Sequence, residues 1–190
     1  MITSVNSWMW FLTRSTGIVA AVLAVLSLVL GLAFSGRFTR GAKPNWWLSM
    51  HNWLGGMTLG FIGAHLLVAF LDSDTGLRLI DLVLPSTTAG WAIGWGVVAM
   101  WIFAAVTLTS PNRIRRRLPR RLWHMLHLLS IPAVVLTGVH TYQTGSDMTG
   151  KLFAAGFALL AGAAVYPMVV RFATRKQRRR PTRSLPVSTH

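Results

Sequence analysis

Five long apolar stretches, separated by short polar breaks, constrain the fold of this chain more than any other feature. Each stretch is close to the roughly 20 residues that a helix needs to cross the hydrocarbon core of a bilayer. Backbone polar groups in lipid must bond to one another, so segments of this kind form helices. The sequence therefore predicts an all-α membrane protein, a bundle of five transmembrane helices. The stretches cover roughly residues 14–34, 48–71, 88–108, 122–142 and 152–170.

The charged residues are sorted between alternate loops. Of the 19 Lys and Arg residues, 16 lie in the loops after the first and third stretches and in the C-terminal segment, whereas the 4 acidic residues all lie in the other two loops. Because Lys and Arg beside membrane helices stay on the cytoplasmic side, we expect the N-terminus outside and the C-terminus in the cytoplasm. The chain then divides into a transmembrane domain at 1–172 and a basic, disordered cytoplasmic tail at 173–190.

Composition excludes several function classes. The chain has no cysteine, which rules out disulfides, thiol catalysis and iron–sulfur clusters. A net charge of +15 would suggest nucleic acid as the partner of a soluble protein. Here membrane topology and attraction to anionic lipid account for it, so we expect membrane lipid and no nucleic acid. The first thirteen residues contain no Lys or Arg, so we expect the first helix to be retained rather than cleaved as a signal peptide.

Four of the six histidines lie inside the predicted helices, where ionisable residues are costly to insert and mark functional sites. His51 and His65 are fourteen residues apart on the second helix, and His127 and His140 are thirteen apart on the fourth. These spacings correspond to about 21 and 20 Å along a helix. Both helices run outward, so His51 and His127 are expected near the cytoplasmic face, with His65 and His140 near the external one.

Two histidines at equal depth on facing helices predict a haem site. A b-type haem with two axial imidazoles takes one histidine from each side of the porphyrin, and helical bundles build such sites from facing helices. We therefore expect two b-type haems as cofactors, with iron held by His51 and His127 in the inner site and by His65 and His140 in the outer one. A cofactor-free transporter of protons or metal ions lined by histidines is the alternative, and a mere membrane anchor is a third class.

Helical rotation raises a difficulty for the fourth helix. Fourteen residues at about 100° each end about 40° short of whole turns, so His51 and His65 share a face. Thirteen residues leave about 220°, which would place His127 and His140 on nearly opposite faces of an ideal helix. Pro132 lies between them, and proline distorts helices, so we expect a local distortion there.

Several other residues are candidates for supporting roles. We expect Arg14 to pair with a propionate of the outer haem, although snorkelling to the headgroups is the alternative. His124 is an alternative inner ligand or an interfacial residue without a special role. The tryptophans inside the spans are expected to be buried filler rather than electron relays: Trp53, Trp95 and Trp101. Four glycines in the second helix would admit either a flat ring or a neighbouring helix: Gly55, Gly56, Gly60 and Gly63.

Together these motifs resemble the ferric reductase-like transmembrane domain family. The superfamily includes ferric reductases, NADPH oxidases and the haem subunit of the methionine-sulfoxide reductase system, and the likeness extends from about residue 8 to 172. The paired histidine spacing is the most specific signal. The motifs are His51-x13-His65, His127-x12-His140, the run from Trp123 to Leu129, the run from Arg14 to Gly17, Asp72, and the run from Gly145 to Asp147.

The resemblance implies an oxidoreductase component of electron transport in the bacterial plasma membrane, with electrons passing outward through the two haems. We expect this chain to act without the flavin and NAD(P)H domain of complete reductases, so the implied donor is a separate flavoprotein or a quinol. The implied acceptor is ferric iron or an external partner protein such as a reductase. NADPH oxidases carry a further histidine near the outer site where this chain has Ala69, which argues against superoxide production.

Overall fold

The computed structural model describes residues 3–35, 45–85, 89–145 and 150–178. All regular structure in these ranges is helical. In chain order the elements are α1 (Thr3–Ser35), α2 (Asn45–Leu71), the 3-10 helix η1 (Ser73–Thr75), α3 (Leu79–Val83), α4 (Trp91–Thr109), α5 (Asn112–Arg115), α6 (Arg120–Leu128), α7 (Ser130–Thr144) and α8 (Lys151–Arg178).

Five segments of these helices are long and apolar enough to cross a membrane, as the sequence predicted. The fourth span is built from α6 and α7 together, whereas each of the other spans belongs to one helix. The chain is thus an all-α, multi-pass membrane protein. The spans are Trp8–Ala33, Asn45–Leu71, Trp91–Thr109, Arg120–Thr144 and Lys151–Val170.

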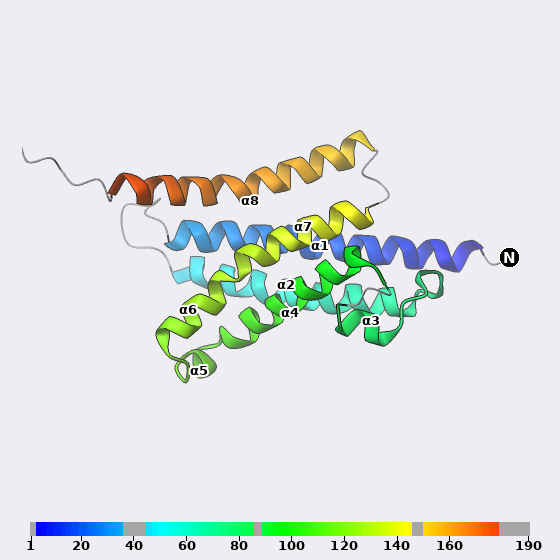
Figure 1. The fold of residues 1–190 in the computed structure, drawn as a ribbon, viewed down its shortest axis with the longest axis horizontal. Helices are drawn as coiled ribbons and strands as arrows, with labels where there is room; N and C mark the ends of the chain where they lie inside the picture. Colours follow the sequence, from blue (N-terminus) through cyan, green and yellow to red (C-terminus); the bar gives the residue numbers. More distant parts are fainter. Residues whose placement is uncertain (1–2, 36–44, 86–88, 146–149, 179–190) are drawn as a thin grey trace, which may run out of the picture.

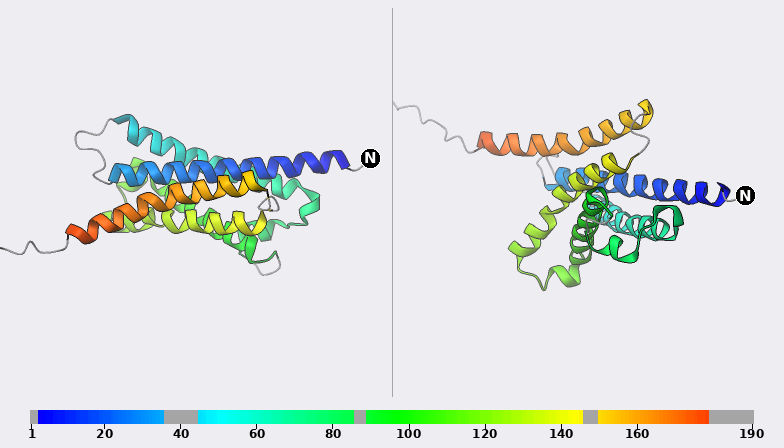
Figure 2. Two further views of the ribbon diagram at one scale, coloured as in Figure 1. Left: turned by 90° about the horizontal axis from the view of Figure 1, so that it is seen from above. Right: turned by 45° about the vertical axis from the view of Figure 1, so that its right-hand side comes forward.

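The long helices lie roughly along one common direction (Figure 1). The N-terminus, η1 and α3 lie at one end of the bundle, and α5 and the C-terminal end of α8 lie at the other (Figures 1 and 2). The Arg-rich segment 113–121 is therefore at the opposite end from Asp72, Asp74 and Asp81. Asp147 and the basic loop at 36–44 lie outside the described residues.

Small side chains make up much of the interior, and many large apolar ones face outward. Ala24, Ala99 and Ala133 are buried in the core, where they let the helices approach closely. Large apolar side chains are exposed instead, and Leu152 and Leu159 of α8 are 91% and 73% exposed. This distribution suits a bundle whose surroundings are lipid tails, because burying apolar groups between helices then gains little over leaving them in lipid.

The fourth span is broken at Leu129, between α6 and α7. The Leu129 N–H donates to the Leu126 carbonyl three residues back, at 3.0 Å, and Ser130 Oγ donates to the His127 carbonyl at 2.8 Å. Pro132 lies in the first turn of α7, where its missing N–H costs no helical hydrogen bond. The distortion expected near Pro132 is therefore present, as a tight turn that precedes the proline.

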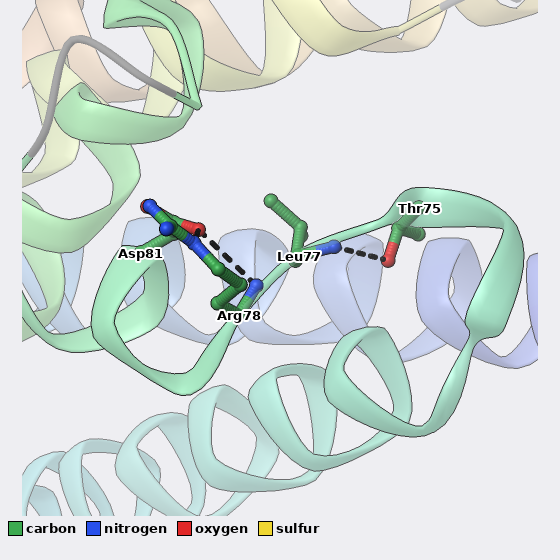
Figure 3. Close-up of polar contacts among 4 residues, drawn as sticks. All are labelled: Thr75, Leu77, Arg78 and Asp81. Carbon is green, nitrogen blue, oxygen red and sulfur yellow. Dashed lines mark hydrogen bonds and ion pairs between the residues drawn. The ribbon is translucent and has the colours of Figure 1, made fainter.

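Short polar turns follow α2 at the end of the bundle that carries α3. Asp72 is buried and caps η1, because its Oδ1 accepts from the Asp74 N–H at 3.2 Å. Asp81 is also buried, and it forms an ion pair with Arg78 at 3.0 Å, shown in Figure 3 together with the Leu77 to Thr75 bond. Hydrogen bonding to the Asp81 carboxylate raises the pKa of the Arg78 guanidinium. These acids stabilise the turns they occupy.

Helix α8 lies beside α1 and extends to Arg178, so residues 173–178, expected in the tail, are helical here. Residues 179–190 lie outside the described part of the chain. An apolar crevice of about 780 Å³ separates α8 from α1 and α7. Its walls include Val22, Tyr142 and Phe157 and none of the four intramembrane histidines, so it is a lateral groove at the lipid-facing side.

We expect Asp72→Ala to lower the free energy of unfolding by about 1 kcal/mol, the usual cost of losing a helix cap. Asp72→Asn is the matched control, because asparagine also caps well, and it should be nearly neutral. Thermal unfolding in detergent measures both. Equal destabilisation by the two variants would show that the negative charge, rather than the cap, is what matters.

Candidate functional site

The four intramembrane histidines meet in two pairs. The ring centroids of His51 and His127 are 5.8 Å apart, and those of His65 and His140 are 6.3 Å apart. One member of each pair comes from α2, and the other comes from α6 or α7. The structure thus brings together the residues that the sequence spacing paired, and the turn at Leu129 is what allows His127 and His140 both to face α2.

These separations fit an iron held between two imidazoles. A metal lies about 2 Å from a ligating imidazole nitrogen, and the ring centre is about 1 Å further back, so two axial rings on one iron have centres about 6 Å apart. Among the described residues no group of three or more His, Cys, Asp or Glu side chains could hold a metal ion. Paired ligands suit haem iron, because the porphyrin supplies its remaining bonds.

Three of the four histidines have a fixed tautomer. In each, Nδ1 lies within hydrogen-bond distance of a backbone carbonyl on a neighbouring helix, and a carbonyl only accepts, so Nδ1 carries the proton. Nε2 is then left with the lone pair that a metal needs, the arrangement common for metal-bound histidines. The acceptors are the carbonyls of Ser27 for His51 (2.9 Å), Thr13 for His65 (2.8 Å) and Ala92 for His140 (2.8 Å).

A glycine lies beneath each of these three rings. A Cβ built on Gly17 would lie 3.0 Å from the His65 ring, one on Gly31 3.0 Å from His51, and one on Gly96 2.8 Å from His140. Real Cβ atoms essentially never come as close as 2.8 Å, so Gly96 requires glycine or a displaced imidazole. At Gly17 and Gly31 the contact of 3.0 Å would be unusually tight, and the imidazole would have to move by a few tenths of an ångström.

Each glycine lies four residues after the carbonyl that accepts the Nδ1 bond: Thr13 and Gly17, Ser27 and Gly31, and Ala92 and Gly96. We call each such combination of carbonyl and glycine a histidine seat. Two seats are on α1 and one is on α4, so the helices that carry no paired histidine supply the supports.

The sequence analysis missed the seats, although a signal was present. Gly17 and Gly31 are fourteen residues apart on α1, the same interval that separates His65 and His51 on α2. Matching intervals on two adjacent antiparallel helices would have indicated that each glycine faces a histidine.

The His51 and His127 pair lines a cavity of about 320 Å³ between α1, α2, α4 and the fourth span. Its walls include one residue from each of these four segments that lies about halfway along the helix between the His51 level and the His65 level. Each is six or seven positions from a paired histidine or a seat glycine on the same segment: Ala24, Thr58, Phe103 and Val134. All four are buried. They form a layer that separates the His51 level from the His65 level.

The glycines of α2 contribute open space. Gly55 and Gly56 line the cavity beside His51, and a Cβ on Gly56 would meet nothing within 4 Å. The same is true of Gly60 and Gly63. Close packing of a neighbouring helix on Gly56 and Gly60, one of the two expectations for this stretch, is therefore not seen, and space for a flat ring remains.

His127 differs from its three counterparts. Its Nδ1 is buried and has no hydrogen-bond partner among the described residues. Its ring stacks on Trp123, with centroids 4.9 Å apart, and the Arg115 guanidinium lies 5.4 Å from the Trp123 ring centre on α6. His124 is exposed and is not among the residues that line the cavity.

Arg14 lies one residue after Thr13, whose carbonyl accepts from His65, so it is close to the His65 level. Its guanidinium lies 4.4 Å from the Trp10 ring centre, a cation–π contact. The Thr13 hydroxyl is buried and has no hydrogen-bond partner among the described residues, as is the case for Trp123 Nε1 near the other pair. Each level therefore has a buried polar group without a hydrogen-bond partner among the described residues.

Two of the three tryptophans within the spans, Trp53 and Trp101, are not buried filler as expected, whereas Trp95 is half-buried. Trp53 and Trp101 are 72% and 52% exposed, and Trp101 Nε1 donates to the Val83 carbonyl at 2.7 Å, which ties α3 to α4. Trp95 contacts Trp91, with centroids 5.4 Å apart. Outward-facing tryptophans suit contact with lipid and headgroups.

Comparisons with known proteins agree with the site. Residues 16–138 match the family described as ferric reductase like transmembrane component. The match includes His51, His65 and His127 and ends two residues before His140. No curated protein and no solved structure gives a significant match. The family match covers well over half of a chain that has five apolar spans and two levels of paired histidines. This protein therefore belongs to the ferric reductase-like transmembrane family, which suggests a role in electron transfer across membranes.

Proposed function

We propose that this chain is a di-haem b electron-transfer subunit that passes electrons from a cytoplasmic or quinol donor to an acceptor outside the membrane. The pairing of His51 with His127 and of His65 with His140 carries the proposal, because the ring separations of 5.8 and 6.3 Å suit axial ligation. The first pair would hold the inner haem and the second pair the outer one. When bound, haem supplies one-electron redox chemistry, and the protein supplies ligation, burial and orientation.

The residues around each pair support this assignment. The seats hold three imidazoles with Nδ1 protonated, so Nε2 can bind iron without further proton loss. Arg14 and the Thr13 hydroxyl lie next to the carbonyl that accepts from His65 and would receive a propionate of the outer haem. Trp123, which stacks on His127, would offer its Nε1–H to the inner haem. The two levels are separated by about 21 Å along α2, which spans most of the roughly 30 Å hydrocarbon core.

The charges at the two ends of the bundle support an outward path. The Arg-rich segment 113–121 marks the cytoplasmic end, so the N-terminus is outside and the C-terminus inside. A separate flavoprotein or a quinol would reduce the inner site, and an external protein or ferric iron would oxidise the outer one. The bacterial plasma membrane is the proposed location.

Purified protein is expected to show reduced-minus-oxidised haem absorption bands and about two haems per chain by a pyridine haemochrome assay. His51→Ala and His65→Ala should each remove one haem, because each deletes an axial ligand. His124→Ala is the matched control and should keep both haems, since His124 lies outside the cavity. A colourless wild-type protein would reject the proposal and favour a cofactor-free, histidine-lined transporter.

Gly96→Ala is expected to weaken binding of the outer haem about 10- to 100-fold, the usual cost of disturbing the support of a ligating histidine. The added Cβ would lie 2.8 Å from His140 Nδ1 and displace the ring. Gly138→Ala on α7 is the control, because its Cβ would meet nothing within 4 Å. Haem retention during dilution in detergent measures both. Equal retention by the two variants would show that the seat does not support ligation.

The proposed orientation can be tested with single cysteines, since the chain contains none. Ser73→Cys lies in the exposed turn after α2 and should react with a membrane-impermeant maleimide in intact cells. Asn112→Cys, in exposed α5, should react only after the cells are permeabilised. The reverse pattern would invert the topology and with it the direction of the proposed path.

A further inference from the structure

The three histidine seats follow one register, which identifies where a fourth would be. On α1, the two carbonyl residues, Thr13 and Ser27, are fourteen residues apart. The two seat glycines, Gly17 and Gly31, are also fourteen residues apart. The same step on α4, from Ala92 and Gly96, leads to Val106 and Ser110. The fourth place therefore offers a carbonyl like the others but has serine where each of the other seats has glycine.

Hydroxyl groups occupy the carbonyl at this fourth place. Ser110 Oγ donates to the Val106 carbonyl at 2.6 Å, and Thr109 Oγ1 donates to the same oxygen at 3.2 Å. α4 ends here, and Pro111 follows without an N–H to continue the helical hydrogen bonds. A hydroxyl bond does not by itself exclude a histidine, because the Thr13 carbonyl accepts from Thr16 Oγ1 at 3.0 Å and from His65 Nδ1 at 2.8 Å. What the fourth place lacks is the glycine, because serine carries a Cβ where the other three seats leave room for an imidazole.

His127 is the histidine that would use this place. Val106, Ser110 and His127 line the same cavity. His127 Nδ1 is buried without a hydrogen-bond partner in the described structure, whereas the other three paired histidines all donate to a seat carbonyl. The missing seat and the missing hydrogen bond therefore coincide at one histidine of one pair.

We propose that Ser110 is a positioning residue that keeps His127 from forming the Nδ1 hydrogen bond made by the other three ligands, and so raises the reduction potential of the inner haem. This inference rests on the proposed function. An Nδ1–H bond to a carbonyl makes an imidazole a more basic ligand. A more basic ligand favours ferric iron, so a ligand without the bond favours the ferrous state and a higher potential.

The consequence is that the two haem sites are unlike by construction. The outer site has two ligands that donate to seat carbonyls, and the inner site has one. Because Ser110 acts through His127, its effect is on ligand strength rather than on ligation itself.

The test is a redox titration of the purified full-length chain, followed at the haem bands. Ser110→Gly restores the seat. It should lower the midpoint potential of the inner haem, leave that of the outer haem unchanged, and retain about two haems per chain. Thr137→Val is the matched control: it removes a helical hydroxyl that donates to the Ala133 carbonyl on α7 and should leave both midpoints unchanged.

A second titration in a His140→Ala background, which retains only the inner haem, identifies the site that shifts. A fall in the midpoint potential of that remaining inner haem supports the proposal. If one midpoint falls in the two-haem protein but the inner midpoint is unchanged in this background, the shift belongs to the outer haem and the proposal is overturned. Unchanged midpoints, or equal shifts in both haems, also overturn it. Ser110→Ala removes the hydroxyl but keeps the Cβ, so it should leave both midpoints unchanged even if Ser110→Gly does not assemble. A fall in the inner midpoint of Ser110→Ala overturns the proposal. A colourless wild-type protein, by contrast, overturns the proposed function itself.

Discussion

The hydrogen bond from a histidine Nδ1 to a carbonyl of the neighbouring helix is the interaction on which the arrangement of this bundle depends. It ties α2 to α1 at two levels and α7 to α4 at one. To form it, the imidazole must lie across the backbone of the adjacent helix, where a Cβ on Gly17, Gly31 or Gly96 would be 2.8–3.0 Å from the ring. Glycine at these positions therefore allows the close approach, and the bond to the carbonyl fixes the tautomer of the imidazole.

The fourth span meets the same requirement by breaking its helix. A continuous helix would turn His127 and His140 to nearly opposite sides, about 220° apart. The tight turn at Leu129 changes the phase between α6 and α7, and both rings then face α2. Proline three residues later fits in the first turn of α7 without losing a hydrogen bond. The turn and the seats thus solve one geometric problem, which is to bring four imidazoles to two common levels.

The supports at the two levels are not equivalent. His65 and His140 both use a seat, whereas His127 stacks on Trp123 and its Nδ1 has no hydrogen-bond partner among the described residues. Helix α4 ends at Thr109, one residue before the position where a fourth seat would have its glycine. Ser110 stands at that position, and its hydroxyl bonds to the Val106 carbonyl. The proposal therefore links the end of α4 to the environment of His127 through a single residue.

Much of the fold could be predicted from local patterns along the chain. The length of each apolar stretch determined the five spans, and the equal spacing of His51 with His65 and of His127 with His140 indicated two levels. Even the distortion near Pro132 followed from counting helical turns. The expectations for single side chains were less successful, since Trp53 and Trp101 face outward and Gly56 and Gly60 do not pack against a helix.

Hydrophobic length and helical phase are properties of consecutive residues, so the sequence by itself determined the number of spans and the histidines that share a depth. Every residue has a backbone carbonyl, however, and only the register between packed helices decides which carbonyl lies beside a ring. The tertiary structure alone therefore decided that the carbonyls of Thr13, Ser27 and Ala92 hold three histidines. It also decided that the Val106 carbonyl accepts from Ser110, while His127 Nδ1 has no acceptor among the described residues.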